Sequence, residues 1–136
     1  MASRSDWAPG GADDVNEHVS TKVLIVDDHP TFRSTARLLL ESEGFDVIGE
    51  APDGMSAIEA AGELHPDLVL LDVNLPDLDG FDVAARITSV LGAPAVVLTS
   101  SRDSSDFGPL VHRSGARGFI PKGELSGAAL TELMVQ

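Results

Sequence analysis

Residues 67–80 read Asp-Leu-Val-Leu-Leu-Asp-Val-Asn-Leu-Pro-Asp-Leu-Asp-Gly, and they are the strongest indication of the fold in this chain. Leu68 to Leu71 are four apolar residues in a row, which is typical of a strand covered on both faces, as in a parallel sheet. Asp72 follows where this strand leaves the core. Because open α/β sheets bind ligands at the carboxyl ends of their strands, Asp72 is a candidate site residue. The alternative is that Asp72 only caps a turn before Pro76.

A second segment of the chain ends in the same way. Val23 to Val26 are again apolar, and Asp27 and Asp28 follow directly. If the two strands are neighbours, three carboxylates meet at one end of the sheet, where their like charges raise their pKa values and destabilise the fold unless a cation is present. Mg²⁺ takes oxygen ligands of this kind, and Mn²⁺ is an acceptable substitute. The two segments together therefore predict a site for Mg²⁺ at Asp27, Asp28 and Asp72.

The length and composition indicate one globular domain. The chain has 136 residues, of which 43% are hydrophobic, so it is long enough for one core and too short for two domains. Its apolar runs are far shorter than the ~20 residues of a membrane span, and residues 1–20 have no apolar centre like that of a secretory signal. The absence of cysteine excludes disulfides and thiolate metal sites. We therefore expect a cytoplasmic protein without a membrane partner.

The net charge of −13 argues against nucleic acid as a partner. Such an acidic chain is repelled by phosphate backbones, and its nine lysines and arginines are scattered singly along the sequence. We therefore expect no direct binding of nucleic acid. Residues 1–20 are rich in Gly, Asp, Ser and Ala, and we predict that they form a disordered acidic extension ahead of a domain at 21–136.

From Thr21 onward the sequence alternates between strand and helix signals five times. The predicted strands are 23–26, 45–50, 68–72, 95–99 and 118–121. The predicted helices are 31–43, 53–64, 80–91, a short one that starts near 107–109, and 124–134. Repeated units of this kind give a parallel sheet with right-handed crossovers. The predicted fold class is therefore α/β, a flavodoxin-like doubly wound five-stranded parallel sheet with the order 2-1-3-4-5 and helices on both faces.

Several individual side chains carry expectations of their own. The third predicted helix places these residues toward the core: Phe81, Ala84, Ala85, Ile87 and Leu91. The fourth helix is short because of Gly108-Pro109, since proline is accepted only in a first helical turn. We expect His29 to be a loop residue without a ligand role. Asp77 and Asp79 are expected to serve the turn and the N-terminus of the third helix.

Polar residues follow four of the predicted strands: Asp27-Asp28 after the first, Asp72 after the third, Thr99-Ser100 after the fourth and Lys122 after the fifth. In this arrangement the chain resembles the receiver domain of bacterial two-component response regulators. Residues 26–33, Val-Asp-Asp-His-Pro-Thr-Phe-Arg, and the glycine after Lys122 are similar to the subgroup that is often attached to helix-turn-helix output domains. The resemblance covers about residues 21–135.

This resemblance implies a role for each of these residues. Asp72 is the phosphoacceptor, whose carboxylate attacks the phosphoryl group of a histidine kinase to give an aspartyl phosphate. Asp28 binds Mg²⁺ directly, Asp27 acts largely through water, and the backbone carbonyl of Asn74 adds a further ligand. Lys122 forms a salt bridge to the phosphoryl oxygens. The expected partner is a sensor histidine kinase or a phosphotransfer protein.

The resemblance also implies a conformational switch. Thr99 donates its hydroxyl to the phosphoryl group, and N–H groups around Asn74 and Ser100 complete the cradle. Phosphorylation draws Thr99 toward Asp72 and leaves space into which Phe119 rotates, although a plain core role is the alternative for Phe119. Output is expected through the face of the fourth helix, fifth strand and last helix, toward a downstream protein or a phosphorylation-dependent homodimer.

Three other functions compete with this interpretation. A phosphohydrolase of the haloacid dehalogenase type also uses a strand-end Asp, but it has a second Asp two residues later, where this chain has Asn74. We therefore expect self-phosphorylation from phosphodonors and slow self-dephosphorylation, without true enzymatic turnover. A flavin carrier needs a hydroxyl- and glycine-rich first loop, whereas this loop is Asp27-Asp28-His29-Pro30. The third alternative is an interaction module with an unused pocket.

The signalling function has two forms. Relatives of this subgroup usually continue into a DNA-binding domain, whereas this sequence stops shortly after its last predicted helix. We expect a stand-alone receiver that signals through protein contacts. The alternative is the receiver part of a truncated DNA-binding transcriptional regulator.

Overall fold

The structure is a computed structural model that describes residues 20–101 and 107–135. Five parallel strands form one sheet in the order β2-β1-β3-β4-β5, and they are β1 (Lys22–Val26), β2 (Asp46–Ala51), β3 (Leu68–Asp72), β4 (Ala95–Ser100) and β5 (Gly118–Pro121). The helices are α1 (Pro30–Ser42), α2 (Gly54–Leu64), α3 (Gly80–Thr88), α4 (Gly108–Arg113) and α5 (Gly127–Met134). The predicted fold class and strand order are confirmed. The predicted extension lies outside the described residues except for Ser20.

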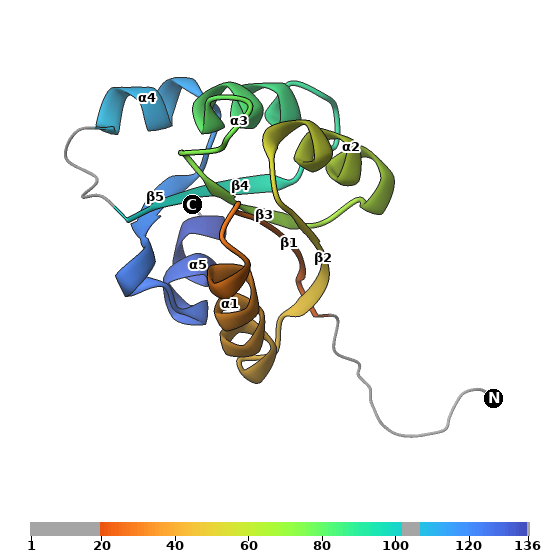
Figure 1. The fold of residues 1–136 in the computed structure, drawn as a ribbon, viewed down its shortest axis with the longest axis vertical. Coiled ribbons are helices and arrows are strands. Elements are labelled where there is room, and N and C mark those ends of the chain that lie inside the picture. The colour runs from red at the N-terminus through yellow and green to blue at the C-terminus, as the bar shows by residue number, and fades with distance from the viewer. Residues whose placement is uncertain (1–19, 102–106, 136) are drawn as a thin grey trace.

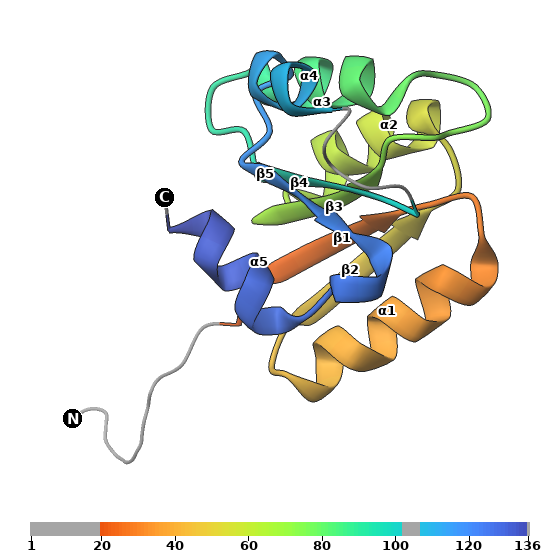
Figure 2. The same cartoon turned by 90° about the vertical axis from the view of Figure 1, so that its left-hand side faces the viewer.

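Helices cover both faces of the sheet. Helices α1 and α5 lie on one face, and α2, α3 and α4 lie on the other (Figures 1 and 2). Successive side chains of a strand point to opposite faces, so Leu24 and Val26 pack under α2 and α3, whereas Val23 and Ile25 pack against α1 and α5. Each fully buried side chain of this kind contributes about 1.5–3 kcal/mol. Among the described residues, no helix has the length and apolar composition needed to cross a membrane.

The register of the strands decides which polar residues meet at the carboxyl edge of the sheet. Val26, the last residue of β1, pairs with Leu71 of β3. The next residue of β3, Asp72, pairs with Thr99 of β4. Ser100 in turn pairs with Pro121 at the end of β5. The residues that end or follow β1, β3, β4 and β5 therefore lie along one edge.

Helix α3 ends at Thr88 and is therefore shorter than the predicted helix at 80–91. The Thr88 hydroxyl donates to the carbonyl oxygens of Ala84, at 2.8 Å, and of Ser114, at 3.1 Å, which joins the last turn of α3 to the segment after α4. The chain then leaves the helix, so Leu91 is fully exposed and not part of the core. Ala85 is exposed as well. The inward positions predicted for Leu91 and Ala85 are therefore wrong.

Helix α5 begins at Gly127, three residues later than predicted. The residues directly after β5 form a short 3₁₀ helix, η3 (Lys122–Glu124). Ser126 then caps α5, because its hydroxyl accepts the N–H of Ala129 at 3.1 Å. The extra 3₁₀ turn leaves Lys122 at the sheet edge, outside the last α-helix.

Candidate functional site

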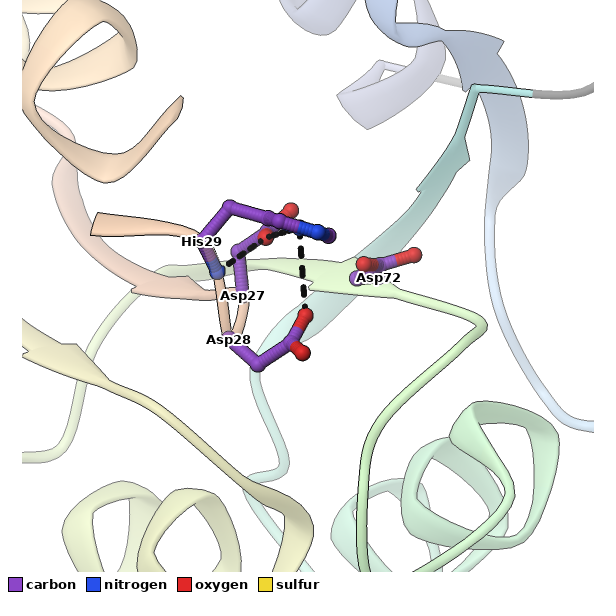
Figure 3. Close-up of side chains that lie close together, drawn as sticks. All are labelled: Asp27, Asp28, His29 and Asp72. Atoms are coloured by element: carbon purple, nitrogen blue, oxygen red, sulfur yellow. Dashed lines mark hydrogen bonds and ion pairs between the residues drawn. The ribbon is translucent and has the colours of Figure 1, made fainter. Parts of the chain in front are cut away.

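Three carboxylates and one imidazole meet at the carboxyl edge of the sheet (Figure 3). Asp27 is fully buried after β1, Asp72 is 2% exposed at the end of β3, and Asp28 is partly exposed. One ligand atom from each of Asp27, Asp28, His29 and Asp72 lies within 4.8 Å of the others. The structure thus brings together the three acids that the sequence singles out.

Lys122 supplies the positive charge of this acid cluster. Its Nζ lies 2.7 Å from Asp27 Oδ2 and 3.5 Å from Asp72 Oδ2. Burial lowers the pKa of the Lys122 ammonium, but the contact with Asp27 and the charges of both acids outweigh burial and raise it. The contact with Asp27 is an ion pair without hydrogen-bond alignment, so Asp27 Oδ2 has no hydrogen-bond donor among the described residues.

The carboxyl group of Asp72 has a raised pKa. Burial is the main cause, and the charge of Asp27 adds to it. The Asn74 N–H, which donates to Asp72 Oδ1 at 3.0 Å, lowers the pKa, as does the ammonium of Lys122. These two groups do not fully offset the rise in the pKa of Asp72 that burial and Asp27 cause. Asp72 is therefore a carboxylate whose negative charge favours a further cation nearby.

Thr99 and Ser100 are fully buried beside the acids. The Thr99 hydroxyl has no hydrogen-bond partner in the described part of the chain. Leaving such a group unpaired costs about 1–3 kcal/mol, so a ligand that accepts a hydrogen bond at this point recovers that energy. Ser100 Oγ lies 3.4 Å from Asn74 Nδ2, a long contact. The predicted hydroxyls thus lie at the same edge as Asp72.

His29 makes contacts with two of the acids. Its backbone N–H donates to Asp27 Oδ1 at 2.9 Å. Its ring Nδ1 lies 2.9 Å from the same oxygen and 3.1 Å from Asp28 Oδ1. His29 is therefore a loop residue, as predicted, that also contacts the acid cluster. The one signal in the sequence was its position directly after the two acids.

Two residues of the first turns of α1 support the cluster, and sequence reasoning missed them. The ammonium of Lys122 lies 4.5 Å from the ring centroid of Phe32, a cation–π distance. Arg33 donates from Nη1 to the backbone oxygen of Asp27 at 2.7 Å and pairs with Glu50 at the end of β2. No pattern of the sequence marks these contacts, because they depend on how α1 crosses the sheet edge.

Phe119 lies in an aromatic row on the α3–α4 side of the sheet. The ring centroid of Phe107, directly before α4, is 5.4 Å from that of Phe119 and 5.6 Å from that of Phe81. All three rings pack against the core cluster on this face. Phe119 is therefore half-buried between the sheet and Phe107, the residue directly before α4, so a change of its rotamer would also change the surroundings of α4.

The loop from β3 to α3 borders the acid cluster. It lines a groove of about 380 Å³ together with Asp28. Asp79 accepts the N–H of Phe81 at 2.8 Å and caps α3, as predicted. Asp77 instead serves α2, because its carboxylate accepts the N–H groups of Gly54 at 2.7 Å and of Met55 at 3.0 Å, and these bonds lower its pKa. The expectation for Asp77 is corrected accordingly.

Comparisons with known proteins identify the family. Residues 23–133 match the family described as the response regulator receiver domain. The virulence transcription regulator BvgA of Bordetella pertussis is 47% identical over 104 residues, which are 76% of this chain and 49% of BvgA. The solved receiver domain of NarL from Mycobacterium tuberculosis has a TM-score of 0.75 and 35% identity, and the match covers 86% of this chain and 98% of that one.

A second similar structure contains ligands. It is the complex of CheX, CheY, BeF₃ and Mg²⁺ from Borrelia burgdorferi, with a TM-score of 0.74, 27% identity, and coverage of 85% of this chain and 87% of that one. The present chain spans about half the length of curated relatives such as BvgA. These relatives are therefore about twice as long as the segment that matches this chain.

The matched segment extends from β1 into α5 and contains the whole acid cluster. Receiver domains are signalling modules and not ordinary enzymes, and they generally bind Mg²⁺ at an acidic pocket. The fold, the acids at the sheet edge and the match agree with one another. This chain belongs to the response regulator receiver domain family of two-component systems.

Proposed function

We propose that this chain is a phosphorylation-dependent switch that accepts a phosphoryl group on Asp72 from a sensor histidine kinase or a phosphotransfer protein, in a reaction that depends on Mg²⁺. One observation carries this proposal, namely the surroundings of Asp72. Its carboxylate lies in the acid cluster, 3.5 Å from Lys122 Nζ and paired in the sheet with Thr99, whose hydroxyl has no partner among the described residues. A nucleophile, a cation and a donor are the groups that phosphoryl transfer uses.

The residues of the acid cluster fit Mg²⁺, which prefers oxygen ligands and keeps several waters. Asp28 and Asp72 would hold the ion through their carboxylates, Asp27 through water and Asn74 through its backbone carbonyl. The buried Asp27 Oδ2, which lacks a hydrogen-bond donor in the described chain, supports a further cation here. When bound, Mg²⁺ neutralises charge on the acids and on phosphoryl oxygens. Mn²⁺ has similar ligand preferences and would substitute for it.

The transfer needs few protein groups. A carboxylate oxygen of Asp72 attacks phosphorus in line, and a P–O bond forms as the P–N bond to the kinase histidine breaks. The electron pair of the broken bond remains on the imidazole nitrogen. Lys122 Nζ, already between Asp27 and Asp72, would reach the phosphoryl oxygens with little movement. The backbone N–H groups of Asn74 and Ser100 would complete the cradle.

The same geometry supports only slow loss of the phosphoryl group. Asn74 stands two residues after Asp72, and an amide cannot act as a general acid or base. Hydrolysis would therefore depend on water alone at the entrance of the site. Self-phosphorylation from small phosphodonors and slow self-dephosphorylation are the reactions that we propose for this chain.

Thr99 would connect the aspartyl phosphate to the output face. Its hydroxyl would donate to a phosphoryl oxygen and move toward Asp72. Phe119 would then rotate into the vacated space and loosen its contact with Phe107, which directly precedes α4. The face formed by α4, β5 and α5 would change as a result. We place a downstream protein or a phosphorylation-dependent homodimer on this face.

Incubation with Mg²⁺ and acetyl phosphate tests the assignment of Asp72. The wild-type protein should gain about 80 Da, the mass of one phosphoryl group, in intact-mass spectra. Asp72→Asn should show no adduct. Asp67→Asn is the matched control, because Asp67 precedes the same strand at its opposite end, where its carboxylate accepts the N–H of Lys22. An equal adduct in Asp72→Asn would refute the assignment.

A second form of the function is a receiver within a DNA-binding transcription regulator. The names of the relatives and the fact that the chain spans about half of their length favour this form. The two forms differ in the mass of the protein in the cells that make it. A protein of 14.2 kDa on an immunoblot would support the stand-alone form, and one of about twice that mass would support the fused form.

A further inference from the structure

His29 reaches the acid cluster from the start of α1. It occupies the position before the first helical residue, Pro30, and a proline restricts the backbone of the residue that precedes it. The bond from its N–H to Asp27 Oδ1 fixes this backbone further. Its side chain is 66% exposed, so packing does not force the ring toward the acids. Figure 3 nevertheless shows the ring turned toward the carboxylates.

The distances of the His29 ring match the spacing of metal ligands. With bonds of about 2.1 Å, neighbouring ligand atoms of an octahedral ion lie about 3.0 Å apart. Nδ1 of His29 lies 2.9 Å from Asp27 Oδ1 and 3.1 Å from Asp28 Oδ1. Asp72 supplies a fourth ligand atom within 4.8 Å of these three. One ion can therefore have the imidazole and the Asp28 carboxylate as adjacent ligands, with Asp72 also within reach.

A hydrogen bond alone is the competing explanation of these distances. Asp27, however, has other contacts that supply charge and a hydrogen bond. Asp27 Oδ2 pairs with Lys122, and Asp27 Oδ1 already accepts the backbone N–H of His29. The imidazole therefore adds a second nitrogen contact to Asp27 Oδ1, and the same ring nitrogen also lies close to Asp28 Oδ1, which places it between two acids as a shared ion would require.

We propose that His29 is a ligand of the metal ion at this site and that its nitrogen makes the site prefer divalent transition-metal ions such as Mn²⁺ and Co²⁺ to Mg²⁺. This inference rests on the metal site of the proposed function. A set of carboxylate, carbonyl and water ligands suits Mg²⁺, whereas imidazole favours transition-metal ions, for which the affinity rises from Mn²⁺ through Co²⁺ to Ni²⁺. Mg²⁺ binds with water in the place of the imidazole.

Titration of the full chain with Co²⁺ tests the ligand role, because the visible spectrum of Co²⁺ reports its ligands. His29→Asn should change the spectrum and lower the affinity for Co²⁺ by at least about tenfold. The affinity of His29→Asn for Mg²⁺, measured by calorimetry, should fall much less than its affinity for Co²⁺. His65→Asn is the matched control, because His65 is an exposed histidine at the end of α2, and it should leave both measurements unchanged.

Three results would overturn the inference. The first is a spectrum and an affinity that are the same in the wild type and His29→Asn, which would leave a hydrogen bond only. The second is an equal rise in affinity for both ions, which would make His29 a competitor of the metal. The third is a wild-type protein that forms the adduct on Asp72 in Mg²⁺ while His29→Asn binds Co²⁺ as tightly as the wild type, so that only the proposed function stands. A spectrum that depends on His29, without an adduct on Asp72, would instead refute the proposed function alone.

Discussion

At the residue scale, the cluster depends on one lysine between two buried acids. Lys122 Nζ lies 2.7 Å from Asp27 and 3.5 Å from Asp72, and its side chain is 17% exposed. Removal of one partner of a buried ion pair leaves an uncompensated charge, which destabilises the folded state. The stability of the chain and the proposed reaction at Asp72 should thus depend on the same ammonium group.

Lys122→Met should fold, but its free energy of unfolding without Mg²⁺ should be lower by about 2 kcal/mol, less than for a fully enclosed pair. Mg²⁺ should restore part of the loss, because it supplies positive charge to the same acids. Chemical denaturation with and without MgCl₂ measures both effects. Lys22→Met, which changes an exposed lysine of β1, is the control. A Lys122→Met chain without folded far-ultraviolet circular dichroism would make the role of Lys122 structural.

The raised pKa of Asp72 predicts a dependence of stability on pH. The folded state holds this proton more tightly than the unfolded state, whose pKa is near the ordinary value of 3.8. The contribution of Asp72 to stability therefore falls as the pH rises from 3.8 through the folded pKa. Without metal, Asp72→Asn should be more stable than the wild type at neutral pH, with a difference that shrinks toward pH 3.8. Urea denaturation across this range measures the difference, and a constant difference would contradict it.

Residue types at strand ends were predictable, whereas their mutual contacts were not. The acids Asp27 and Asp72 follow apolar runs, so the sequence marks them as edge residues. The contact of His29 with these acids depends on the turn before α1, and that of Phe32 with Lys122 depends on the path of α1 over the edge. Neither path is encoded in local periodicity.

At the element scale, α4 has few anchors. It has six residues, none of them buried, and no side chain caps its N-terminus. Phe107 precedes it and packs against both Phe81 and Phe119. Aromatic pairs contribute about 0.5–1.5 kcal/mol each beyond the area that they bury. Phe107 is therefore the main attachment of α4 to the aromatic row.

Phe107→Ala should accelerate amide hydrogen exchange in α4 while α1, on the other face of the sheet, keeps its protection. The free energy of unfolding should fall by about 2–3 kcal/mol, because two ring contacts are lost. Hydrogen exchange followed by mass spectrometry resolves the two helices. Leu110→Ala, at an exposed position of α4, should change little. Equal protection of α4 in the wild type and Phe107→Ala would mean that other contacts hold it.

Strands and helices were predictable where an uninterrupted apolar run or a helix-start residue marks them in the sequence. The apolar runs of β1, β3 and β4 and the Gly108-Pro109 start of α4 gave their positions. The end of α3 was not predictable, because the apolar spacing continues to Leu91 whereas the helix ends at Thr88, whose hydroxyl bonds to the distant Ser114. The 3₁₀ turn before α5 was not predictable either, because the cap at Ser126 places the start of α5 at Gly127 and not at the predicted residue 124.

At the scale of the whole molecule, the net charge of −13 acts together with the acid cluster. Like charges on a folded protein repel, and salt screens them. NaCl should therefore raise the melting temperature modestly, and MgCl₂ at the same ionic strength should raise it further by binding the folded state. Asp28→Asn should lose the additional effect of MgCl₂ and keep that of NaCl. Equal melting temperatures in the two salts would argue against a magnesium site.

The side chain of Asp77 joins two parts of the molecule that are 22 and 23 residues apart in sequence, the loop that follows Asp72 and the first turn of α2. Neither part can shift without the other while this carboxylate holds both N–H groups. A displacement of α2 therefore also moves the backbone around Asn74. If Asp72 is phosphorylated as we propose, the lifetime of the phosphoryl group should therefore depend partly on α2, a helix that does not border Asp72.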